Sequence, residues 1–228
     1  MVRRVFLLKK KGYKYLKYPA IIFFVIVTFI DLYLIRSKQE KKRYYTKPFI
    51  IPGIILIYLL FAHQYNEFLL LALLFSFFGD LLLLFSEKKV FFRLGLFAFL
   101  SSHLFYIYTF LENIPFNRIS PFWIPLALIP YFIYAWKIFR DLRAYLEHYF
   151  IPVILYIVSI IGMSYTSLFR FWTSQGISFW FPLIGSIFFI TSDTLLATRN
   201  FKYGQKKGWV SVMTTYVLAQ LFIMIGFI

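Results

Sequence analysis

Apolar segments of about 20 residues recur throughout this chain, and segments of that length predict membrane-spanning helices. Of the 228 residues, 61% are hydrophobic and only 15% are charged. A soluble domain needs roughly a quarter or more of its residues charged to cover its surface. Because the bilayer core offers no water to satisfy backbone N–H and C=O groups, such segments must be helical. The sequence therefore predicts an all-α, polytopic transmembrane helix bundle.

Eight apolar segments occupy most of the chain. We predict spans over residues 19–35, 48–62, 68–85, 90–111, 121–139, 150–169, 177–198 and 209–228. They form one transmembrane domain, residues 19–228, which follows a basic N-terminal segment at residues 1–18. The connections are too short to hold a soluble domain. Function is therefore expected inside the membrane or at its interface.

The net charge of +16 comes from 25 Lys and Arg residues that lie almost wholly between the predicted spans. Basic loops of this kind set membrane topology and face anionic lipids, so the charge does not indicate nucleic-acid binding. The odd-numbered loops carry 16 of these residues and the opposite side carries 9. The positive-inside rule then places both termini outside the cytoplasm, whereas the basic residues before the first span favour the reverse. We expect a multi-pass protein of the bacterial cytoplasmic membrane.

Asp80 lies inside the third predicted span and Asp193 inside the seventh. An ionised carboxylate in hydrocarbon costs roughly 2.5 to 3.5 kcal/mol on insertion scales, so such residues usually face the bundle interior and mark a function. At 1.5 Å per residue, both lie roughly 8 or 9 Å below the interface on the side of the odd-numbered loops. Asp31 in the first span and Lys47 before the second lie at the same end. The pattern predicts a polar pocket that opens toward one leaflet.

Four more polar side chains lie within the predicted spans: Ser76, His103, Tyr216 and Gln220. Ser76 shares a helix face with Asp80, and Gly79 lets a neighbouring helix or a ligand approach closely. Each polar group also has a structural interpretation. The aspartates would hold the bundle together by pairing with Lys47 or His103, and Tyr216 and Gln220 would join neighbouring helices.

Metal and thiol chemistry are not indicated. The chain has no Cys, and its three His residues are far apart and form no ligand motif. We therefore expect no metal and no cofactor.

The third and seventh spans also resemble each other weakly. Each carries a small residue, an aspartate and apolar residues, and each is followed by a basic loop and another span. Asp80 and Asp193 are separated by 113 residues, about half the chain. This spacing fits a parallel four-plus-four duplication.

Five short motifs resemble those of the YhhN family of integral-membrane proteins, which includes the lysoplasmalogenases. They are Thr46-Lys47-Pro48, Phe78-Gly79-Asp80 and residues 101–106, 192–197 and 214–220. The resemblance covers about residues 19–228. It implies an eight-helix enzyme that hydrolyses the vinyl-ether bond of lysoplasmalogens, releasing a fatty aldehyde and a glycerophosphoethanolamine or glycerophosphocholine. The site residues that it implies are Lys47, Asp80, His103, Asp193, Tyr216 and Gln220.

The implied chemistry suits two buried carboxylates. Vinyl-ether cleavage needs a proton donor and a negative charge, because protonation of the β-carbon creates an oxocarbenium-like cation. One aspartate of the Asp80 and Asp193 pair can stay protonated while the other stays ionised, as in glycoside hydrolysis. His103 would tune or relay the proton.

The remaining candidates are expected to bind substrate. Lys47 would hold the substrate phosphate, as would Arg199 or Lys202. Tyr216 and Gln220 would place the water or the glycerol oxygen. Ser76 and Asp31 are the other two residues expected to bind substrate. Asp31 is included only because of its depth in the first span.

Two other functions compete with this hydrolase. Intramembrane carboxylates in a repeated fold also suit a proton-coupled carrier of small molecules or lipids. A non-catalytic lipid-binding or scaffold protein is the third reading. The expected partners are a lysophospholipid from the bilayer and water, without nucleic acid, and the sequence does not specify an oligomeric state.

Overall fold

Every apolar segment predicted as a span forms a helix in the computed structural model, which describes residues 13–119, 122–146, 149–204 and 210–228. The α-helices in these residues are α2 (Lys17–Arg36), α3 (Ile50–Phe61), α4 (Glu67–Leu84), α5 (Lys89–Leu111), α6 (Trp123–Leu142), α7 (Phe150–Ser167), α8 (Ile177–Ala197) and α9 (Val210–Ile225). No strand occurs within the described ranges. The predicted all-α bundle is confirmed.

Short irregular turns extend several helices. The 3₁₀ turns are Tyr13–Leu16, Glu40–Tyr45, Lys47–Phe49, Phe116–Arg118, Arg143–Tyr145 and Leu168–Trp172, and a π turn covers Thr198–Lys202. The start of the second predicted span is not α-helical: two 3₁₀ turns precede α3, and the second of them carries Lys47. Residues 1–12 of the basic segment and the predicted span starts at Pro121 and Trp209 lie outside the described residues.

Most of these helices have the dimensions of membrane spans. In the described part of the chain, six segments are long and apolar enough to cross a membrane: Lys17–Arg36, Glu40–Phe61, Glu67–Leu84, Lys89–Leu111, Phe150–Trp172 and Ile177–Lys202. α9 is a shorter apolar helix of 16 residues, and α6 contains Pro130. The chain is a membrane protein by the length and composition of its helices.

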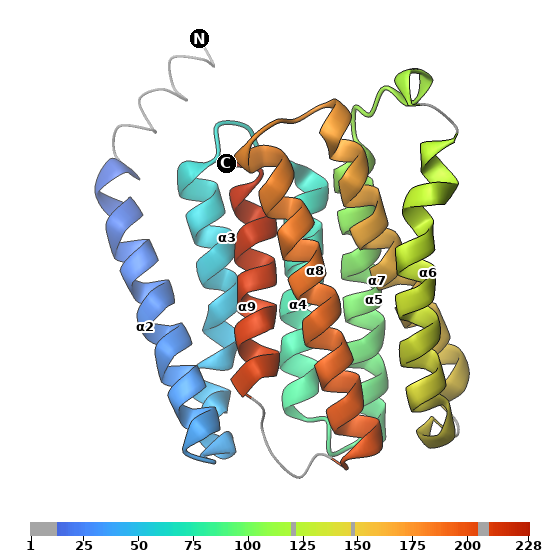
Figure 1. Ribbon diagram of the computed structural model, residues 1–228. Helices are drawn as coiled ribbons and strands as arrows, with labels where there is room; N and C mark the ends of the chain where they lie inside the picture. The colour runs from blue at the N-terminus through green and yellow to red at the C-terminus, as the bar shows by residue number, and fades with distance from the viewer. Residues whose placement is uncertain (1–12, 120–121, 147–148, 205–209) are drawn as a thin grey trace.

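The helices run alternately up and down (Figure 1). α2, α4, α6 and α8 all finish at one end of the bundle, which we call the polar end, whereas α2 begins and α9 ends at the other (Figure 1). α2 and α6 lie at opposite edges of the view, and α6 packs mainly on α7. The predicted odd-numbered loops therefore share one end of the bundle.

The most extensive helix pairs are α4 with α5 and α8 with α9. Each contains a glycine at the contact. A Cβ added at Gly79 would lie 2.6 Å from the Phe99 ring, and one at Gly185 would lie 2.9 Å from the carbonyl oxygen of Ala219. Because real Cβ atoms do not approach this closely, both glycines allow tight packing. The close approach predicted at Gly79 is confirmed; the four-plus-four repeat, which these two pairs would suit, stays a prediction.

Helical periodicity explains why the aspartates face inward. The buried residues of α4 recur every three or four positions: Leu69, Ala72, Leu73, Ser76, Gly79 and Asp80. The same spacing on α8 gives Phe179, Pro182, Leu183, Ser186, Phe189, Ile190 and Asp193, together with the neighbouring positions Gly185 and Ser192. Residues at these intervals share one helix face. Each aspartate is thus the last member of an apolar, inward-facing stripe.

Candidate functional site

Asp80 and Asp193 line one cavity of about 260 Å³ at the polar end of the bundle. The lining comes from the α2–α3 connection, α4, α5, α8, the π turn after α8, and α9. The exposed fractions of the two residues are only 3% and 8%, and their carboxylates are close enough to act on each other electrostatically. The prediction that both face one pocket is therefore confirmed. Their chemical roles stay predictions.

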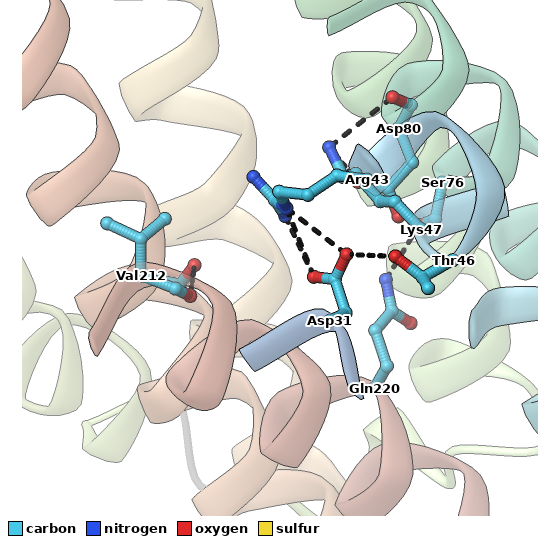
Figure 2. A network of polar contacts seen from close by, with 9 residues as sticks. Asp31, Arg43, Thr46, Lys47, Ser76, Asp80, Val212 and Gln220 are labelled. Atoms are coloured by element: carbon cyan, nitrogen blue, oxygen red, sulfur yellow. Dashed lines mark hydrogen bonds and ion pairs between the residues drawn. The ribbon is translucent and has the colours of Figure 1, made fainter. Parts of the chain in front are cut away.

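Asp80 is paired with a lysine. The Nζ atom of Lys47 lies 2.9 Å from Asp80 Oδ1 and donates a hydrogen bond of 3.3 Å to the Asp80 carbonyl oxygen (Figure 2). Lys47 reaches across because its 3₁₀ turn precedes α3 beside the end of α4. Both side chains are about nine-tenths buried or more. In such surroundings an unpaired charge costs several kcal/mol, so each group stabilises the other.

Part of the Asp80 carboxylate remains free. Its Oδ2 atom is buried and has no hydrogen-bond partner among the described residues. The Tyr216 hydroxyl on α9 is also unpartnered there, and it interacts with Asp80 without reaching regular hydrogen-bond geometry. Both residues line the cavity. Unsatisfied polar atoms beside a cavity are the expected partners of a water molecule or a ligand.

Asp193 has a different set of neighbours. The hydroxyl of Tyr156 on α7 donates a hydrogen bond to Asp193 Oδ2. His103 Nε2 lies 3.8 Å from the same oxygen, which is too far for a hydrogen bond. Among the described residues, no Lys or Arg forms an ion pair with Asp193. The direct contacts of the Asp193 carboxylate are therefore polar, and none in the described residues is an ion pair with Lys or Arg.

His103 supports Asp193 from behind. It is fully buried and lies outside the residues that line the cavity. Its Nδ1 atom is 3.2 Å from the Ser159 hydroxyl, and its ring packs edge-on against Tyr156 and Phe189. His103 Nε2 has no hydrogen-bond partner in the described part of the chain. His103 therefore lies beside the Asp193 carboxylate but away from the cavity lining, and its role in proton transfer stays a prediction.

Asp31 lies at the polar end, as its depth predicted, but it does not line the cavity. It accepts hydrogen bonds from Arg43 Nε at 3.1 Å, Arg43 Nη2 at 2.9 Å and Thr46 Oγ1 at 2.7 Å (Figure 2). Arg43 does line the cavity. Asp31 therefore orients a cavity residue and secures the turn before Lys47.

Ser76 and Gln220 belong to a buried network that ties α4, α5 and α9 together. Gln220 Nε2 donates to Ser76 Oγ at 2.8 Å (Figure 2), and the Tyr106 hydroxyl donates to Gln220 Oε1. Ser76 is also 2.7 Å from the Ser102 hydroxyl. Neither Ser76 nor Gln220 lines the cavity. Their placement favours the interhelical role, and substrate binding by them stays a prediction.

A group of cations surrounds the cavity toward the helix ends. Lys41, Arg43 and Arg199 line it, accompanied by Glu40 and Glu87. Arg199 Nη2 is 3.9 Å from Glu40 Oε2, and its Nε atom is buried without a hydrogen-bond partner in the described residues. A guanidinium with unused donors is suited to a phosphate or carboxylate. Of the two phosphate-binding alternatives to Lys47, Arg199 lines the cavity, whereas Lys202 does not.

A second, apolar cavity of about 50 Å³ adjoins the first between α5, α6, α7 and α8. Its lining is mostly aliphatic and aromatic. The two cavities share Leu83, Phe99, Asp193, Leu196 and Asn200. Asp193 thus lies on the boundary between a polar space and an apolar one.

Sequence reasoning missed Arg43, Thr46, Tyr156 and Ser159. Tyr156 is one of 18 tyrosines, so its type alone carried no signal. Its spacing of three from Ser159 places both on one side of α7, and that polar pair was the available clue. Within the described residues, no group of three or more His, Asp or Glu is arranged to hold a metal ion.

Comparison with known proteins agrees with the motifs. The sequence model of the YhhN family matches residues 42–227. No curated protein and no solved structure matches the chain. The matched region contains Lys47, Asp80 and Asp193, but α2 with Asp31 precedes it, although the motifs suggested a resemblance from about residue 19. Because the match covers most of the chain, this protein belongs to the YhhN family.

Proposed function

We propose that this protein is a membrane-embedded ether hydrolase, in a bacterial cytoplasmic membrane, that cleaves the vinyl-ether bond of lysoplasmalogens. The observation that carries the proposal is the position of Asp193, where the polar and apolar cavities meet. A lysoplasmalogen has one hydrocarbon chain, a polar headgroup and a vinyl ether between them. Its scissile bond therefore lies at the same kind of boundary.

The different partners of the two aspartates suggest their roles. Asp193, which lacks a cationic partner in the described residues, would deliver the proton to the β-carbon of the vinyl ether. Asp80, held as an ion by Lys47, would stabilise the oxocarbenium-like cation. Water adds to the cationic carbon, and the hemiacetal collapses to a fatty aldehyde and the glycerophospho-alcohol. The proton released in the addition restores the acid, so the net change consumes one water.

The remaining cavity groups suit binding and positioning. Asp80 Oδ2 and the Tyr216 hydroxyl, both unpartnered in the described residues, would orient the attacking water. Arg199, with its unused Nε donor, would bind the phosphate together with Lys41. Tyr156 would fix the direction of the Asp193 carboxyl group. Every step uses side chains of this chain and requires no cofactor.

The decisive test compares two substrates with purified protein in detergent. Free aldehyde should be released from a lysoplasmalogen but not from the saturated alkyl-ether analogue, because only the vinyl ether can be protonated on carbon. Asp141→Asn serves as a matched control, since Asp141 is an exposed aspartate on α6 that lines neither cavity. Inertness toward the lysoplasmalogen would reject the hydrolase and direct attention to proton-driven accumulation in liposomes.

A further inference from the structure

An apolar groove continues from the inner cavity to the side of the bundle. It has a volume of about 510 Å³ and lies between α6 and α8. Tyr134 and Ile190 line both this groove and the apolar cavity beside Asp193. Because α6 packs mainly on α7, the α6–α8 seam is left partly unfilled. A continuous apolar surface therefore joins Asp193 to the lipid-facing side of the protein.

The inner cavity is too small to hold a long hydrocarbon chain by itself. Its volume of about 50 Å³ is well below the roughly 150 Å³ of an engineered cavity that accepts benzene. A chain whose first atoms lie beside Asp193 must therefore continue elsewhere. The larger groove begins at the same two side chains, Tyr134 and Ile190.

The inner cavity and the groove together run along a long stretch of α8. Their α8 lining extends from Asp193 in the inner cavity back to Leu183 in the groove, ten residues or about 15 Å of helix rise. That distance is about half of the roughly 30 Å hydrocarbon core. A chain in this groove would run from the polar end into the hydrocarbon core, as lipid chains do in the bilayer itself.

We propose that the α6–α8 groove binds the hydrocarbon chain of a single-chain phospholipid and admits it sideways from the bilayer. This inference rests on the proposed function for the position of the headgroup in the polar cavity. The groove is lined chiefly by apolar side chains, among them Ala127, Leu183 and Ile187. The Tyr134 hydroxyl lies 3.1 Å from Thr194 Oγ1 across the α6–α8 seam, where the groove meets the inner cavity.

A competing path lies on the other side of α6. A groove of about 210 Å³ between α6 and α7 is lined by Ala135 and Ile157, and Ile157 also lines the inner cavity. The two paths can be separated because α6 presents one alanine to each. Ala127→Trp fills the α6–α8 groove, and Ala135→Trp is the same substitution on the same helix facing the α6–α7 groove.

The experiment uses a lysophosphatidylethanolamine with an ester-linked chain that carries a diazirine at its middle. This probe contains no vinyl ether, so it binds without being consumed by the proposed reaction. After illumination in detergent, labelled peptides are mapped by mass spectrometry, with unlabelled lysophosphatidylethanolamine as competitor. We expect competable labelling of α6 around residues 127–134 and of α8 around residues 183–191.

Ala127→Trp should weaken this labelling at least about tenfold, because displacing even two methylenes from an apolar site costs that much affinity. Ala135→Trp should leave it within about twofold. Thermal unfolding in detergent shows whether each variant is folded. Should Ala127→Trp fail to fold, Ile187→Trp replaces it, since Ile187 lines the groove and is 51% exposed.

Two results would overturn the proposal that the α6–α8 groove binds the chain. One is labelling that resists competition and spreads over outward-facing helices. The other is a loss of competable labelling in Ala135→Trp but not in Ala127→Trp. Aldehyde release is measured on the same preparations to separate this inference from the proposed hydrolase. Competable groove labelling without aldehyde release keeps the groove and rejects the hydrolase. Aldehyde release without competable groove labelling keeps the hydrolase and rejects the groove as the binding site of the chain.

Discussion

Asp80 and Asp193 are the same residue type, and each lies on the inward-facing stripe of its helix, α4 or α8. Their surroundings nevertheless differ. Asp80 on α4 meets the Lys47 ammonium at 2.9 Å. Asp193 on α8 receives a hydrogen bond from the neutral Tyr156 and has His103 nearby. One carboxylate is compensated by a permanent charge and the other by neutral dipoles. Two aspartates in similar sequence surroundings thus have distinct electrostatic settings.

This difference is the basis for the two roles that we propose for the aspartates within one cavity. An ion-paired carboxylate keeps its charge and can stabilise a cation, whereas a carboxyl group among neutral partners is free to carry and deliver a proton. The weak sequence similarity of the two spans gave no basis for choosing between them. The partner of Asp80 comes from the 3₁₀ turn before α3, and the neighbours of Asp193 come from α5 and α7. The following variants test whether the difference is real.

Replacing Asp193 should have the largest effect on turnover. Asp193→Asn keeps the shape of the side chain but removes the acid, and general acid catalysis contributes about 10²- to 10⁴-fold. We expect aldehyde release to fall by about 10³-fold, with the thermal unfolding temperature in detergent little changed. Asp141→Asn is the control. Release within tenfold of the unmodified protein would remove Asp193 from the mechanism.

Asp80→Asn should lower both turnover and stability, which distinguishes it from Asp193→Asn. The substitution leaves the Lys47 ammonium buried without its counter-ion, and breaking such a pair costs about 3 to 5 kcal/mol. We expect turnover to fall about 10²-fold or more and the unfolding temperature to drop. Adding Lys47→Met should restore the unfolding temperature but not turnover. Equal unfolding temperatures for Asp80→Asn and Asp193→Asn would contradict the proposed contrast.

Tyr156→Phe probes the neutral side of the comparison and should have an intermediate effect. It removes the hydroxyl that donates to Asp193 while keeping the ring. A hydrogen bond to a charged group contributes about 1.5 to 3 kcal/mol, so turnover should fall by a factor of about 10 to 100. Tyr165→Phe on the same helix, whose hydroxyl donates to the Ile124 carbonyl, should change turnover little. Similar kinetics for both variants would show that Tyr156 does not act on Asp193.

Asp31→Asn should have the smallest effect on the chemical step. Asp31 is fully buried and holds Arg43 through two nitrogen atoms, but it does not line the cavity. We expect kcat to stay within a few-fold of the unmodified protein, KM to rise because Arg43 loses its orientation, and the unfolding temperature to fall. A loss of kcat as large as that of Asp80→Asn would mean that Asp31 takes part in the reaction.

The sequence predicted the eight α-helices of the described residues and the convergence of the two aspartates, because both depend on local, repeating patterns. Asp80 and Asp193 end stripes spaced by three and four residues, and their depth follows from helix rise alone. Gln220 and Ser76 looked like candidate site residues for the same reason. Periodicity shows that a side chain faces inward, but not whether it meets a cavity or another helix. Gln220 and Ser76 meet each other.

What the sequence by itself determined is the architecture: apolar segments of membrane length, basic connections, and acids at one end of the bundle. What only the tertiary structure decided is which groups contact each acid, and where the polar cavity adjoins apolar space. The Lys47–Asp80 and Tyr156–Asp193 contacts join residues 33 and 37 positions apart. The physical reason is that helix formation responds to near neighbours in the chain. The partners of a side chain instead depend on how whole helices rotate and pack, and no local pattern records that arrangement.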